Sequence, residues 1–151
     1  MLNPTRQRGF TIIELLIVIA ILGILSIMAI PAYGSFVARQ QANEGVQLTS
    51  GWRQSISLYH ARKGVWPTVN DLNDILVVTN LSSRNVKAVS LGDKGVIEVT
   101  FGGRETNSQI SGRVLELVPY VGPNGDADWK CHASSAWPAD VLPDFCRNNA
   151  R

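Results

Sequence analysis

The chain begins with a long apolar segment that contains a single charge. From Phe10 to Ala38 the only charged residue is Glu14, whereas charged residues are frequent in the rest of the chain. As an α-helix, the stretch from Phe10 to Ile30 would be roughly 32 Å long, which is enough to cross the hydrocarbon core of a bilayer. The pattern therefore predicts a hydrophobic, membrane-spanning helix over residues 10–35.

Beyond Pro31 the apolar run gives way to helical periodicity. The larger apolar side chains recur at intervals of four, four and three residues, at Leu48, Trp52, Ile56 and Tyr59. Extended backwards, the same face holds Gly45, Gln41 and Val37. Gly64 suits a helix cap, and Pro67 follows it. One long helix over about residues 10–63 is predicted, and its second half should pack on a globular head.

The second half of the chain has the alternation of β-strands. Strands are expected at 96–101, 114–121 and 128–133, with 86–91 as a fourth at the sheet edge and a short helix near 69–77. Turn signals stand at Gly92-Asp-Lys-Gly95 and Gly122-Pro-Asn-Gly125. Because the connections are short, the sheet should be antiparallel. The fold class is therefore α+β: a long N-terminal helix packed on a four-stranded antiparallel sheet, with the head at residues 36–151.

Charge adds an orientation to this picture. The 151 residues include 14 Lys and Arg against 12 Asp and Glu, which argues against a chain that mainly neutralises nucleic-acid phosphate. Arg6 and Arg8 precede the apolar run, and the next basic residue is Arg39. The positive-inside rule then leaves the N-terminus in the cytoplasm and sends the head outward.

The two cysteines fit the same compartment. Cys131 and Cys146 have 14 residues between them, and no CxxC motif is present. His60 and His132, the only histidines, are far apart in sequence, so the usual spacing of zinc ligands is missing. A disulfide between Cys131 and Cys146 in an oxidising compartment is the simpler interpretation.

Glu14 separates three interpretations of the N-terminus. A cleavable secretory signal could end at Ala32-Tyr33-Gly34, but the uncharged run from Leu15 to Ile30 has 16 residues, beyond the usual length of about 15. A plain membrane anchor is the second alternative. Neither explains Glu14, because a carboxylate deep in a bilayer costs on the order of 2.5–3.5 kcal/mol and needs a partner. The most economical partner is a positive charge on a second copy of the chain.

The string Arg8-Gly9-Phe10-Thr11-Ile12-Ile13-Glu14-Leu15 resembles the prepilin leader junction of type IV pilins and type II secretion pseudopilins. The resemblance implies that a prepilin peptidase cleaves after Gly9, so that residues 1–9 form a leader. It also implies methylation of the new Phe10 amine. Glu14 would then pair with the N-terminal amine of a neighbouring subunit.

Two further features extend the resemblance. Gly23 and Pro31 match family positions at which the helix is thought to unwind or kink, and both residue types are unfavourable inside a helix. The segment from Cys131 to Cys146, with Leu142-Pro143 before its second cysteine, resembles the C-terminal disulfide-bounded loop of type IVa pilins.

The resemblance implies a structural subunit of a type IV pilus, polymerised through its N-terminal helix for adhesion, twitching motility or DNA uptake. The subunit would be a single-pass protein of the bacterial inner membrane before assembly and would then belong to the extracellular pilus. Implied partners are further copies in a homo-oligomeric filament, prepilin peptidase, the inner membrane and the pilus assembly machinery. Host surfaces and DNA are further contacts that the filament could make. The alternative within the same fold is a minor pilin or a type II secretion pseudopilin.

Other sites carry weaker signals. Asn124, Asp126 and Asp128 alternate like the start of a calcium loop, but the EF-hand spacing is not completed, and a hairpin turn is the expected use. A DNA-binding face remains a rival hypothesis on the basic residues Arg84, Lys87, Arg104, Arg113, Lys130 and Arg147. No nucleophile elbow, Walker motif or dinucleotide fingerprint is present. We expect no enzymatic activity, catalytic residue, cofactor or metal.

Overall fold

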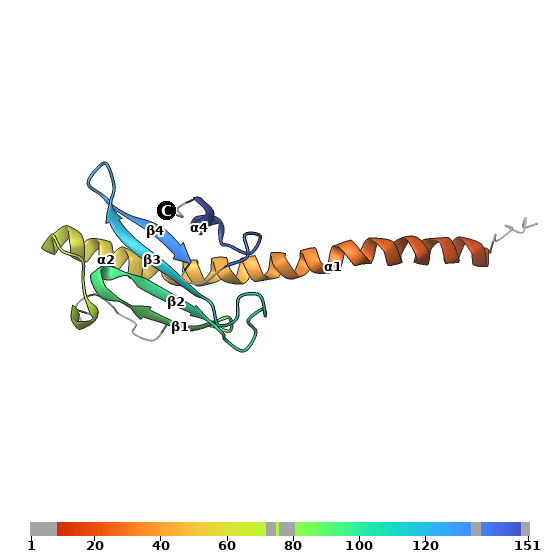
Figure 1. Ribbon diagram of the computed structural model, residues 1–151, viewed down its shortest axis with the longest axis horizontal. Coiled ribbons are helices and arrows are strands. Elements are labelled where there is room, and N and C mark those ends of the chain that lie inside the picture. Colours follow the sequence, from red (N-terminus) through yellow and green to blue (C-terminus); the bar gives the residue numbers. More distant parts are fainter. Residues whose placement is uncertain (1–8, 72–74, 76–80, 134–136, 149–151) are drawn as a thin grey trace, which may run out of the picture. The chain divides into compact units, whose positions relative to one another are not determined.

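The computed structural model describes residues 9–71, 75, 81–133 and 137–148 (Figure 1). The chain divides into two compact units, Met1–Gly34 and Ser35–Arg151. Within the described residues, the first unit is helical from Ile12 onward, and the second contains the sheet.

Two consecutive helices, α1 (Ile12–Leu48) and α2 (Ser50–Lys63), confirm the long N-terminal helix. Only Thr49 stands between them. This buried threonine donates from both its backbone N–H and its hydroxyl to the carbonyl of Val46, at 3.3 and 2.7 Å. Such bonding back to the preceding turn tightens a helix locally. At the far end, Gly64 caps α2 with φ of 73° and donates to the carbonyl of His60 at 2.8 Å, as predicted.

In the head, the helix buries a stripe that differs in part from the predicted one. Its later part is as expected, with Trp52, Ile56 and Tyr59 buried. Earlier, the buried residues are Ala38, Ala42, Gly45 and Val46. Val37 and Gln41, which were also predicted on this face, are half-buried, and the Gln41 amide bonds to the backbone of Glu105 and Asn107 in the head. Small side chains rather than large ones face the sheet here, which lets the helix backbone come close to it.

The four predicted strands form one antiparallel sheet in the order β1-β2-β3-β4 (Figure 1). They are β1 (Val86–Leu91), β2 (Ile97–Phe101), β3 (Val114–Val121) and β4 (Ala127–Ala133). The expectation that residues 86–91 lie at the edge is confirmed. Alternate residues of β2 and β3 are fully buried and form the centre of the core: Ile97, Val99, Phe101, Leu115 and Leu117.

The C-terminal segment is fixed to the head by covalent and polar contacts. The predicted disulfide between Cys131 of β4 and Cys146 of α4 (Asp144–Asn148) is present, with Cα atoms 4.8 Å apart. Arg39 donates to the carbonyl of Asp140, with its Nε at 2.8 Å. The ring of Trp137 meets the buried ring of Phe101 edge-on at 5.5 Å. This part of the chain is therefore an integral layer of the head.

The segment before the sheet contains a 3₁₀ turn, η1 (Val69–Asp71). Of the short helix expected near residues 69–77, positions 72–74 and 76–77 lie outside the described residues.

Candidate functional site

The start of α1 brings together the residues that the sequence singled out. Glu14 folds back over the first turn, and its Oε2 accepts hydrogen bonds from the Thr11 backbone N–H at 3.0 Å and the Thr11 hydroxyl at 2.9 Å. The Thr-x-x-Glu spacing is the sequence signal of a capping box, in which a glutamate bonds back to the residue that begins the helix. The carboxylate is thus held one residue from Phe10.

Glu14 has no cationic partner among the residues that the structure describes. A carboxylate in the first turn interacts favourably with the partial positive charge of the helix N-terminus. Within the described residues, that field and the two bonds from Thr11 stabilise the carboxylate.

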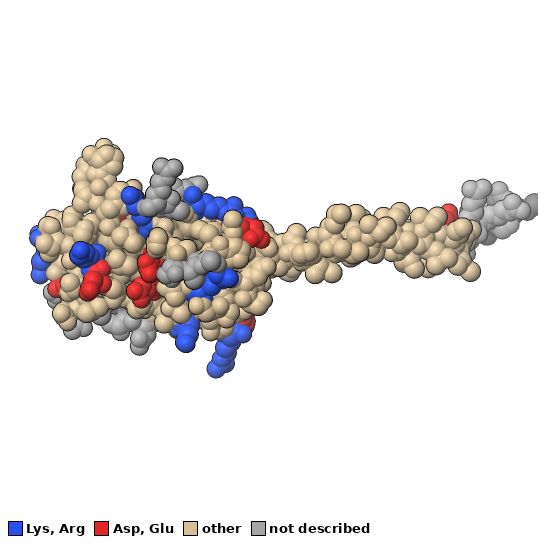
Figure 2. Space-filling view, in the orientation of Figure 1, with Lys and Arg blue, Asp and Glu red and all other residues tan. Residues whose placement is uncertain are grey.

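The side chains on both sides of Glu14, from Phe10 to Ile30, form an apolar surface. Phe10 and Ile12 are 85% and 81% exposed, and the large apolar residues up to Ile30 are all exposed. Figure 2 shows almost no charge along this part of the helix. Within the described residues there is one helix long and apolar enough to cross a membrane, by length and composition. Such a surface has to be covered by lipid or protein, because exposing it to water is strongly unfavourable.

Gly23 and Pro31 both lie inside α1, which is helical through both positions. A Cβ atom on Gly23 would meet nothing within 4 Å, so no contact within the chain requires a glycine there. Both residues weaken the helix, by about 1 kcal/mol for glycine and about 3 kcal/mol for proline.

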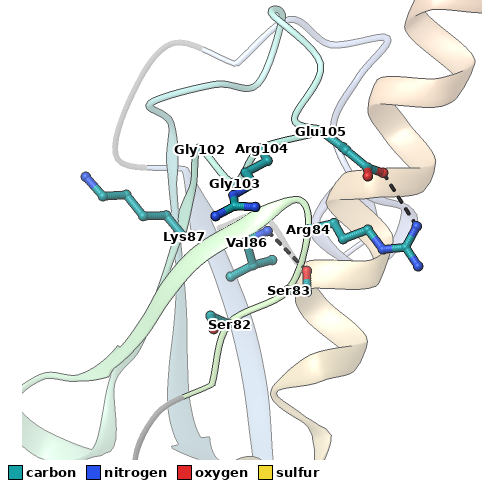
Figure 3. A pocket seen from close by; sticks show the side chains of 9 residues that line it. All are labelled: Ser82, Ser83, Arg84, Val86, Lys87, Gly102, Gly103, Arg104 and Glu105. Atoms are coloured by element: carbon teal, nitrogen blue, oxygen red, sulfur yellow. Dashed lines mark hydrogen bonds and ion pairs between the residues drawn. The ribbon is translucent and has the colours of Figure 1, made fainter.

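Three of the six proposed DNA-binding residues lie together. Arg84, Lys87 and Arg104 line a hollow of about 610 Å³ beside β1. In Figure 3, Lys87 points away from Arg84, which turns towards Glu105 at 3.7 Å. The cations therefore do not converge on one point in the hollow.

The other three are engaged elsewhere in the head. Arg113 Nε donates to the carbonyl of Gln109 at 2.7 Å, and Arg147 donates to the carbonyls of Ala139 and Asp140. Lys130 lies over the ring of Tyr120 at 4.7 Å. The structure does not bring the six together as one basic face.

The hairpin expected from Asn124 and Asp126 is confirmed, since Gly122 and Asp126 close the turn between β3 and β4 with a 2.8 Å backbone hydrogen bond. Asp128 accepts from the Tyr120 hydroxyl and from the Trp129 N–H, both at 2.8 Å. These bonds lower the pKa of the Asp128 carboxyl below its ordinary value of 3.8. Over the described residues there is no group of three or more side chains that could hold a metal ion.

Comparison with known proteins accounts for both units. Residues 38–147 match the family model for pilin, a bacterial filament protein, and residues 4–30 match the prokaryotic N-terminal methylation motif. The chain is 41% identical over 145 residues to the fimbrial protein EcpC of Eikenella corrodens, and the aligned region covers 95% of this chain and 93% of that relative.

It is also 35% identical over 127 residues to the type IV major pilin PilE of Neisseria gonorrhoeae, covering 84% of this chain and 75% of that relative. Over a shorter stretch of 51 residues, 34% of this chain and 32% of that relative, it is 57% identical to the type IV major fimbrial protein FimA of Dichelobacter nodosus. The matched pilin model covers more than two thirds of the chain, and the methylation motif covers the turn that holds Glu14. The chain belongs to the pilin family of bacterial filament proteins.

Proposed function

We propose that the chain is a structural subunit of a type IV pilus, polymerised through its N-terminal helix. The observation that carries this proposal is the exposed apolar surface of α1, which begins with one carboxylate that has no cation among the described residues. The pilus would serve adhesion, twitching motility or DNA uptake. The match to the pilin family supports this function over a plain membrane anchor.

Processing would precede assembly. Residues 1–9 are the leader, prepilin peptidase cleaves between Gly9 and Phe10, and the new Phe10 amine is methylated. The methylation motif matched over residues 4–30 supports this sequence of events. Cleavage creates a positive charge next to Thr11, which already holds Glu14 at the start of α1.

Glu14 would then set the axial position of each incoming subunit. In an apolar filament core a lone carboxylate is strongly unfavourable, and pairing it with the amine of a neighbouring Phe10 removes most of that penalty. A subunit displaced along the axis would leave both charges unpaired. The pair therefore selects one register among the many that an apolar helix surface would allow.

The remainder of α1 supplies cohesion. Its apolar side chains stay out of water by packing on the same segments of other copies. Gly23 and Pro31 bracket the stretch that would unwind or kink in the filament, because they lower the free energy needed to open the helix there. Before assembly the same surface would sit in the inner membrane, with the head outside and the assembly machinery acting on the membrane-embedded subunit.

The test compares Glu14→Ala with Ser26→Ala, which removes another polar side chain from the same helix; the Ser26 hydroxyl donates to the carbonyl of Leu22 at 2.7 Å. Pili are sheared from cells and quantified, and the cell-bound mature chain is measured in parallel. We expect both variants to be processed and inserted, but only Ser26→Ala to assemble normal filaments. Normal amounts of pili from Glu14→Ala would show the assembly role to be wrong.

A further inference from the structure

Arg53, in the second turn of α2, is a cation without an acceptor in the described part of the head. The residue is half-buried, and its Nε atom is buried with no hydrogen-bond partner. Its guanidinium lies over the ring of Phe145 in α4, 5.3 Å from the ring centre. No carboxylate among the described residues comes within ion-pair distance of it.

The other half-buried arginines of the head differ from it. Arg39 Nε donates to the carbonyl of Asp140 at 2.8 Å, and Arg113 Nε donates to the carbonyl of Gln109 at 2.7 Å. Each of these guanidinium groups holds a loop in place through a hydrogen bond to a backbone carbonyl. The polar atoms of Arg53 make no such contact with the described residues, although burial lowers the pKa of its guanidinium and so opposes its charge.

A cation held in this way is unfavourable for the isolated head. Partly buried charges are normally paired, and a buried donor without an acceptor loses its bonds to water without replacing them. The Phe145 ring compensates in part, through a cation–π contact that leaves the planar donors of the guanidinium free to bind an anion. Because the Nε atom is enclosed within the head, an acid of another molecule would have to bind the two terminal nitrogens of the guanidinium, which can hold a carboxylate in a two-point contact.

We infer that the Arg53 guanidinium, backed by Phe145, receives a carboxylate from a second copy of this chain. The inference rests on the proposed filament, in which identical heads lie against one another. It assigns a head-to-head contact in addition to the one between N-terminal helices.

The candidate carboxylates are the exposed ones that have no partner among the described residues of their own head: Asp93, Asp126, Asp140 and Asp144. Asp144 directly precedes Phe145, and the Asp140 carbonyl accepts from Arg147, so both acids belong to the C-terminal segment that backs Arg53. Filament contacts are head-to-tail, so two different patches meet. Asp93, between β1 and β2, and Asp126, on the β3–β4 hairpin, are therefore the expected partners.

The test replaces Arg53 by methionine in the full chain, which keeps an apolar contact with Phe145 and removes the charge. Arg62→Met is the matched control, since Arg62 is an exposed arginine of the same helix. Two quantities are measured: the melting temperature of the mature chain in detergent, and the yield of sheared pili with increasing salt.

We expect Arg53→Met to leave the melting temperature unchanged or raised, because an unpaired charge is lost. We expect it to lower the pilus yield by about tenfold or more, as loss of a buried interfacial ion pair does. Arg62→Met should change neither. A fall in melting temperature would place the acceptor within the same head and overturn the inference, as would pili as abundant and salt-resistant as those of the wild type.

Charge reversal identifies the partner. Arg53→Glu should abolish pili, and Asp93→Arg or Asp126→Arg in the same chain should restore them. Failure of both reversals would also overturn the inference. If the wild type and Arg62→Met form pili of this chain throughout, the proposed function stands whichever way Arg53 behaves, so the two claims fail separately.

Discussion

At the scale of single residues, small side chains determine how the helix meets the sheet. Gly45 lies where an added Cβ would be 2.5 Å from Cζ and 2.7 Å from Cε1 of Phe101. Phe101 is fully buried and also touches Trp137, so its ring has little room to move. The helical periodicity placed Gly45 on this face, but it could not reveal how closely the helix backbone approaches the sheet there.

Gly45→Ala should therefore destabilise the head by roughly 1–3 kcal/mol, the usual effect of overpacking a core. Gly51→Ala is the control, since a Cβ there meets nothing within 4 Å and alanine favours a helix by about 1 kcal/mol. Urea unfolding followed by tryptophan fluorescence measures both, because Trp52, Trp66, Trp129 and Trp137 all lie in the head. Equal effects of the two substitutions would contradict the close packing at Gly45.

Asp71 fixes the segment after α2 through three hydrogen bonds. Its carboxylate accepts from the Tyr59 hydroxyl and from the backbone N–H and hydroxyl of Thr68, each at 2.9 Å. The Thr68 backbone bond, then the Tyr59 and Thr68 hydroxyls and the charge of Lys63, lower the pKa of Asp71 below its ordinary 3.8. Because the folded pKa is the lower one, this stabilisation is complete above about pH 4 and is lost as the pH falls through the folded pKa.

Asp71→Asn should thus lower the melting temperature at pH 7 and reduce the further loss on acidification below pH 4. The pKa of Asp128 is lowered by bonds from the Tyr120 hydroxyl and the Trp129 N–H, so Asp128 should cause part of the fall in melting temperature that this variant still shows in acid. Melting curves between pH 2.5 and 7 test this pair of effects. If the melting temperature of Asp71→Asn fell below pH 4 as steeply as that of the wild type, the Asp71 carboxylate would not be the group that causes the loss of stability in acid.

At the scale of elements, the strands were predicted more accurately than the helix face. Alternation and the two glycine-bounded turns gave β1 and β3 their observed limits, and β2 and β4 differ from the prediction by one residue at one end. The interruption at Thr49 was not predicted, because a threonine bonds back to the preceding turn here in a buried setting that the sequence does not reveal. The contact of Arg39 with Asp140, 101 residues away, likewise depends on the tertiary fold.

The disulfide should be the main stabiliser of the C-terminal layer. It joins residues 15 positions apart, and closing a loop of that length contributes about 3 kcal/mol in the chain-entropy model. A variant with both Cys131→Ser and Cys146→Ser should lose about that much unfolding free energy. Arg39 and Asn43, which bind the backbone at Asp140 and Asp144, should keep part of the segment in place.

Hydrogen exchange in residues 137–148 of the serine variant measures how much of the segment remains protected. Wild-type stability in that variant would mean that the polar contacts alone hold the C-terminal layer. Complete loss of the folded head would mean that the covalent link is needed for folding itself.

At the scale of the whole molecule, the chain has two surfaces of different polarity, one charged and one apolar. The head carries charges of both signs over the face in Figure 2, whereas α1 up to Ile30 exposes apolar side chains. The sequence predicted this division directly, because the charge-free run and the alternating strands are separate signals. It also pointed to Glu14, since one acid in such a run is conspicuous.

The sequence did not point to Thr11 as the partner of Glu14, although the Thr-x-x-Glu spacing was available. It could not point to Arg53, because exposure and missing acceptors are properties of the folded head. The proposed roles of Gly9, Phe10, Gly23 and Pro31 follow from the family pattern and are open to direct measurement.

In the proposed filament, every chain has been cut between Gly9 and Phe10, and its new amine meets Glu14 of a neighbour. Intact-mass and N-terminal analysis of sheared surface filaments measures this cut. We expect one dominant species that starts at Phe10, carries one methyl group on its amine and retains the Cys131–Cys146 disulfide. A mature chain that starts after Gly34, or filaments that contain the chain with residues 1–9 attached, would contradict it.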